Sequence, residues 1–141
     1  MSYVHCGAIA TCTIANLHNT LDTALSVYDY LVNHPDEIPE ALDDDDMDSD
    51  AAVKYIEMYL DCQPDGKLTI SYDTEDLNDD SMVFDFLASH FARLQSSFFM
   101  TVNWWVTDSK HTADAGTDYY DKQNKLIDVP EILNNYFAAQ S

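Results

Sequence analysis

The stretch Lys67-Leu68-Thr69-Ile70-Ser71-Tyr72 alternates polar and apolar side chains without interruption. Successive side chains of a β-strand point to opposite faces of the sheet, so this alternation predicts a strand with one buried face. Residues 3–15 are apolar or small, with several β-branched side chains, and predict another strand near the N-terminus. We therefore expect a β-sheet to form one layer of the fold.

Apolar residues at three- and four-residue spacing predict helices on either side of this strand. The first helix covers residues 21–31, after a cap at Asn19 or Thr20, and ends at His34-Pro35. The second begins at a cap at Asp48 or Ser49, and its apolar stripe consists of Ala52, Val53, Ile56, Tyr59 and Leu60. The third begins at Asn78 or Asp79, and its stripe consists of Val83, Phe86, Leu87, Phe91 and Leu94.

The C-terminal part predicts three strands and one more helix. Residues 97–107, 117–121 and 125–128 predict an antiparallel meander, and Pro130 suits the first turn of a short helix that carries Ile132, Leu133, Tyr136 and Phe137. The order βααβαβββα predicts a single α+β domain, residues 1–141, with two layers. We expect an antiparallel or mixed sheet of about five strands, four helices, and an acidic connecting segment at 35–48.

The composition excludes several classes of function. The 141 residues hold 26 Asp and Glu against six Lys and Arg, a net charge of −20, while 46% hydrophobic residues suffice for a core. Three glycines and one arginine, Arg93, leave little material for binding phosphates, so we expect no direct nucleic-acid binding and no cofactor. No stretch has the length of a membrane span and no signal peptide is evident, so we expect a cytoplasmic protein with three reduced cysteines.

The negative charge is concentrated in two blocks. Residues 36–50 carry −9 and residues 73–85 carry −6 of the net charge. Like charges packed this closely repel one another, so two such blocks indicate a function for the field that they create. The predicted partner-binding acids are Asp36, Glu37, Glu40, Asp43, Asp44, Asp45, Asp46, Asp48 and Asp50 in the first block, and Asp73, Glu75, Asp76, Asp79 and Asp80 in the second.

Other interpretations of these acids stay open. Asp48, Asp50, Asp79 and Asp80 also suit helix N-termini, where a carboxylate stabilises the helix dipole. Asp46, Asp48, Asp50 and Glu57 have the spacing of a calcium-binding EF-hand, but Ala51 replaces the glycine that this loop needs. We therefore predict no specific metal site. Asp108, His111 and Asp114 would bind a metal only on a helix, whereas their segment is polar and typical of a loop.

The pair Trp104-Trp105 predicts an aromatic surface. Neighbouring strand residues point to opposite faces, so Trp104 would face the helices while Trp105, Phe99 and one of Tyr119 and Tyr120 would lie on the open face. An exposed aromatic patch commonly anchors a protein partner or a second copy of the chain. Phe99 and Trp105 are therefore added to the predicted partner-binding residues, with a homodimer through this face as one outcome.

The composition is similar to that of DNA-mimic proteins, a functional class that includes phage inhibitors of restriction and CRISPR enzymes. This resemblance is one of charge and size. It implies a non-enzymatic inhibitor, encoded by a phage or mobile element, that acts in the host cytoplasm and blocks the basic nucleic-acid channel of a host defence protein. Two alternatives are an immunity or antitoxin protein that caps a basic nuclease, and an acidic salt-adapted domain that binds divalent cations.

Overall fold

The computed structural model describes residues 4–39, 42, 48–74, 79–96, 99–108 and 113–127. The helical elements are α1 (Thr20–Asn33), the short 3-10 helix η1 (Pro35–Glu37), α2 (Ser49–Glu57) and α3 (Asp79–Leu94). The strands are β1 (Val4–Thr13), β2 (Leu60–Cys62), β3 (Lys67–Thr74), β4 (Met100–Asp108), β5 (Ala113–Tyr120) and β6 (Leu126–Ile127).

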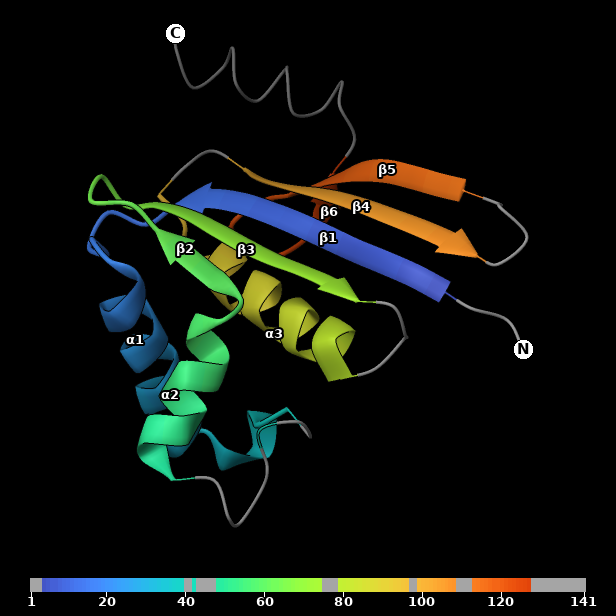
Figure 1. The fold of residues 1–141 in the computed structure, drawn as a ribbon. Helices are drawn as coiled ribbons and strands as arrows, with labels where there is room; N and C mark the ends of the chain where they lie inside the picture. The colour runs from blue at the N-terminus through green and yellow to red at the C-terminus, as the bar shows by residue number, and fades with distance from the viewer. Residues whose placement is uncertain are drawn as a thin grey trace, which may run out of the picture.

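All six strands belong to one sheet in the order β2-β3-β1-β4-β5-β6, and every neighbouring pair is antiparallel. The N-terminal strand β1 lies in the middle, where Ala10 pairs with Ile70 of β3 on one side and with Val102 of β4 on the other. The three α-helices lie against one face of the sheet (Figure 1). The α+β class with two layers is confirmed.

The core lies between these two layers. The alternate residues Leu68 and Ile70 of β3 are fully buried, as the alternation of this strand predicts, and they pack in one cluster with Phe91 of α3. Ala8, Ala10 and Cys12 of β1 join the same cluster. The buried residues of β1 are small, which lets the helices approach the centre of the sheet closely.

The caps of α1 and α2 form where the sequence predicts them, and the predicted cap of the third helix lies outside the described side chains. The side chain of Asn19 accepts a hydrogen bond from the Asp22 N–H at the start of α1, and the side chain of Asp48 accepts one from the Ala51 N–H at the start of α2. Each carboxyl or amide oxygen satisfies a backbone donor that has no partner within the helix.

The predicted number of strands is wrong in detail, and the described residues contain three of the four predicted helices. The described residues form six strands and three α-helices rather than about five strands and four helices. The added strand is β2, which has only three residues and follows α2 without a Gly or Pro, so Tyr59 and Leu60 also fit the helical spacing. The predicted last helix, at residues 130–137, lies outside the described residues.

The strand β5 begins at Ala113, four residues before the predicted start at Thr117. Its first half, Ala113-Asp114-Ala115-Gly116, is too polar and too small to predict a strand. Gly116 nevertheless has a clear role, because a Cβ at this position would lie only 2.6 Å from the ring of Trp104 on the neighbouring strand. The glycine makes room for that indole.

Gly7 makes room for the second tryptophan in the same way, on the other face of the sheet. A Cβ on Gly7 would collide with the Trp105 ring and would lie 2.6 Å from the Tyr72 carbonyl oxygen. Gly7→Ala is therefore expected to lower the free energy of unfolding by about 1–3 kcal/mol, the usual cost of overpacking. Urea denaturation followed by tryptophan fluorescence measures this loss.

Ile9→Ala is the control for this substitution, since Ile9 lies two residues further along β1 and is 38% exposed. Its effect is expected to stay within about 0.5 kcal/mol, as for most surface positions. A Gly7→Ala variant as stable as the wild type would contradict the position of Trp105 over β1.

Candidate functional site

The first acidic block lies at one end of the helix layer. α1 and α2 pack against each other as a helical hairpin, and η1 and the first turn of α2 lie at the end that points away from the sheet (Figure 1). Asp36 and Glu37 belong to η1, which follows α1, while Asp48 caps α2 and Asp50 lies in its first turn. We call these four exposed residues the hairpin tip. Glu40 and Asp43–Asp46 of the same block lie outside the described residues.

Helix dipoles explain only half of the hairpin tip. The N-terminus of α2 attracts Asp48 and Asp50, which therefore stabilise that helix. Asp36 and Glu37 instead follow the C-terminus of α1, whose last turn contains no basic residue. A carboxylate at a helix C-terminus faces the negative end of the dipole and is unfavourable there. These two acids are therefore not explained by helix stability.

Glu37 is held in place by a hydrogen bond from a tyrosine. The Tyr30 hydroxyl donates to the Glu37 carboxylate at 2.6 Å, and this bond is the main reason that the pKa of Tyr30 is raised above its usual value. The Tyr30 ring in turn stacks on His34 at a centroid distance of 4.0 Å. Part of the hairpin tip thus has a fixed geometry.

The described residues of the second acidic block do not lie at the hairpin tip. Tyr72 packs on Phe84 of α3, so the next residue, Asp73, points to the opposite, open face of the sheet, where it is exposed. Asp79 and Asp80 begin α3, but their side chains, like all of Glu75 and Asp76, lie outside the description. The hairpin tip and Asp73 therefore occupy different faces of the molecule.

The predicted aromatic residues Phe99 and Trp105 both lie on the open face of the sheet. The rings of Phe99 and Tyr119 meet edge to face at a centroid distance of 5.5 Å. Trp105 lies on the same face above Gly7, where it is half-buried. None of the described helices covers this face (Figure 1).

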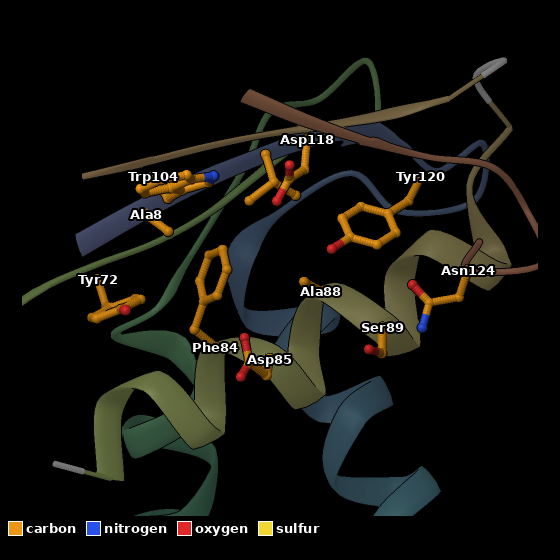
Figure 2. Close-up of a pocket in the computed structure, with 11 residues that line it drawn as sticks. Ala8, Tyr72, Phe84, Asp85, Ala88, Ser89, Trp104, Asp118, Tyr120 and Asn124 are labelled. Atoms are coloured by element: carbon orange, nitrogen blue, oxygen red, sulfur yellow. The ribbon is translucent and has the colours of Figure 1, made fainter. Parts of the chain in front are cut away.

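A cavity that the sequence did not predict lies between α3 and the sheet. It has a volume of about 460 Å³. α3 packs mainly on β3 and β1, so the helix-side face of β4 and β5 extends beyond it. The cavity lies between α3 and this part of the sheet (Figure 2). Its lining residues are Ala8, Tyr72, Phe84, Asp85, Ala88, Ser89, Val102, Trp104, Asp118, Tyr120 and Asn124.

Two carboxylates face this cavity from opposite layers. Asp85 rises from α3 at the rim, and Asp118 descends from β5 beside the Trp104 ring (Figure 2). Burial raises the pKa of Asp85, and burial, Asp118 and Asp85 together raise the pKa of Tyr120. We call Asp85, Asp118 and the rings of Tyr72, Phe84, Trp104 and Tyr120 the acidic-aromatic pocket.

Sequence reasoning missed this pocket for two reasons. Asp85 lies between Phe84 and Phe86 in the sequence of α3. A single acid at such a position predicts an exposed, solvated side chain. Asp118 and Tyr120 lie on the same face of β5 as Gly116, which pairs with Trp104. The first half of this strand, which contains Gly116, was not predicted. The pattern Asp118-Tyr119-Tyr120 opposite an aromatic strand is the one signal that points to the pocket.

The described residues contain no group of three His, Cys, Asp or Glu side chains placed to hold a metal ion. Asp48 caps α2 and Asp50 and Glu57 lie within it, so the spacing of an EF-hand falls on a helix rather than on a loop. His111 and the side chain of Asp108 lie outside the description.

The three cysteines are buried and unpaired, as predicted, and burial raises the pKa of Cys12 to about 12.

Comparisons with protein-family models, with curated proteins and with solved structures found no match to this chain. No helix in the described part of the chain is both long and apolar enough to cross a membrane.

Proposed function

We propose that this protein is a non-enzymatic acidic inhibitor that occupies the basic nucleic-acid channel of a partner protein. The observation that carries the proposal is the charge of the hairpin tip. Asp36 and Glu37 follow the C-terminus of α1, where the helix dipole does not favour a carboxylate, and the block of residues 36–50 carries −9 in total. A sequence keeps such an arrangement when the field itself has a use.

The charge of the whole chain supports the same function. Six cations cannot neutralise 26 acids, so at least twenty carboxylates have no Lys or Arg of their own within the chain. Duplex DNA carries about one negative charge per 1.7 Å of its axis, and its binding proteins present basic grooves of matching density. A carboxylate cluster on a helical hairpin is attracted to such a groove.

Charge and packing have different tasks in this proposal. The carboxylates steer the protein to its partner and make association dependent on salt. Phe99, Tyr119 and Trp105 on the open face add apolar contacts, which survive salt. A phage or mobile-element origin and a cytoplasmic partner, such as a restriction or CRISPR enzyme, suit this role.

The test uses a variant in which the hairpin tip is neutral: Asp36→Asn, Glu37→Gln, Asp48→Asn and Asp50→Asn. Asparagine caps a helix as well as aspartate does, and glutamine still accepts the Tyr30 hydrogen bond. The immobilised wild type captures basic proteins from a host lysate, and a duplex DNA then elutes them. We expect the association rate of an eluted protein to fall about tenfold for the variant at low salt, and much less at high salt.

The matched control removes the same charge elsewhere: Asp22→Asn, Asp61→Asn, Asp65→Asn and Asp121→Asn. These exposed or half-exposed acids lie at the start of α1, in β2 and in turns beside strands. The control is expected to keep most of the wild-type rate. An equal loss in both variants, or captured proteins that DNA does not elute, would refute mimicry; the second outcome would favour an immunity-type protein.

A further inference from the structure

The acidic-aromatic pocket has the chemistry of a cation site. Four rings and two carboxylates line it, and none of its lining residues is Lys, Arg or His. In Figure 2 the Phe84 ring rises from α3 toward the flat indole of Trp104, and the Tyr120 hydroxyl points into the space between them. The negative charge of Asp85 and Asp118 therefore meets no cation within the pocket.

The size and the ligands favour an organic cation over a metal ion. Ca²⁺ takes six to eight oxygen ligands and Mg²⁺ demands an octahedron, whereas this cavity of about 460 Å³ offers two carboxylates on opposite walls and four aromatic rings. Aromatic faces attract ammonium and guanidinium groups, and carboxylates attract the same positive charge and accept hydrogen bonds from the groups that carry an N–H. The rings would also cover an alkyl stem.

The pocket also has a structural reason to remain open. Trp104 is fixed above the cavity because its ring lies against Gly116, where a larger residue would collide with it. Tyr72 and Phe84 hold the opposite wall together at a centroid distance of 5.2 Å. The aromatic walls are thus supported by packing rather than by a ligand, and such preorganisation lowers the cost of binding.

We propose that the acidic-aromatic pocket binds an organic cation with an alkyl stem, namely an alkylammonium or guanidinium group. This site is separate from the hairpin tip, so a test of cation binding is independent of a test of the proposed function. The same group occurs in free amines and in the side chains of lysine and arginine. Asp118 and Asp85 hold the charge, while Trp104 and Tyr120 contact the stem and the head group.

The experiment is a titration of the full chain with choline, monitored by the indole N–H signals of the two tryptophans in NMR spectra. We expect the signal of Trp104 to shift and that of Trp105 to stay, because the two indoles lie on opposite faces of the sheet. The neutral isostere 3,3-dimethylbutan-1-ol is expected to bind at least about tenfold more weakly, a difference of about 1.4 kcal/mol.

Two variants test the carboxylates at equal net charge. Asp85→Asn with Asp118→Asn is expected to weaken choline binding at least about tenfold. The control pairs Asp114→Asn with Asp73→Asn, because Asp114 is an exposed residue of β5 that does not line the pocket and Asp73 lies on the open face. This control is expected to bind choline as the wild type does.

Agmatine and N-acetyl-arginine methylamide then distinguish a free amine from a protein side chain as the source of the cation. Binding of both supports recognition of a side chain, and binding of agmatine alone supports a free amine. Equal binding of the neutral alcohol, equal loss in the control pair, or no shift of the Trp104 signal with any cation would overturn the proposal. The titration of the wild type gives this answer even if the variants fail to fold.

Discussion

Phe91→Ala is expected to lower the free energy of unfolding by about 3–5 kcal/mol, the usual cost of truncating a buried phenylalanine. Phe91 is completely buried on α3, where it packs in the cluster that joins the helices to the sheet. The truncation removes a ring and leaves a cavity in the one continuous core. Since small domains have a total stability of about 5–15 kcal/mol, this single change takes a large share of it.

Leu94→Ala is the control on the same helix. The sequence assigns Leu94 to the same apolar stripe as Phe91, but the residue is 54% exposed at the end of α3. Its truncation is expected to cost much less than that of Phe91. Chemical denaturation of both variants measures the difference, and similar losses would show that α3 does not pack on the sheet as described.

Stability is expected to fall by about 3 kcal/mol between pH 6.5 and pH 4 because of His90 alone. Burial lowers the pKa of His90 from 6.5 to about 4. As the pH falls, the unfolded chain therefore binds a proton before the folded one does. The neutral ring supports the fold fully above pH 6.5, and this support is lost as the pH falls towards 4.

The surroundings of His90 explain the direction of this shift. Burial is the largest cause, Arg93 on the same helix and His34 directly after α1 lower the pKa further, and Glu37 raises it. The ring packs against Phe86 and Phe91 of α3 and against Tyr30 of α1, at centroid distances of 4.7–5.9 Å. A charged imidazolium would lose its hydration among these rings.

The measurement compares the unfolding of the wild type and of His90→Phe at several pH values. Carboxylates also titrate in this range, but they do so in both proteins, so the difference between the two curves isolates His90. The variant is expected to lose about 3 kcal/mol less on acidification. An equally steep loss in the variant, or an NMR titration of the His90 ring with a pKa near 6.5, would contradict the buried position.

The sequence by itself determined the elements whose signals are local. Asn19 and Asp48 cap their helices because each side chain bonds a backbone N–H three residues away. The alternation of residues 67–72 identified β3 and its buried face, because the period of two belongs to the strand itself. Trp104 was assigned to the helix side of β4 for the same reason, and it lines the cavity there.

Only the tertiary structure decided what depends on contacts between distant segments. β1 lies between β3 and β4, and β2 becomes a strand because its three residues pair with β3 rather than continue α2. Asp73 is separated from the hairpin tip by the sheet, and the sequence alone did not decide whether the two acidic blocks lie side by side. The pocket exists because α3 packs mainly on β3 and β1, so that residues of β4 and β5 line a cavity beside this helix, a consequence of strand order that no local pattern carries.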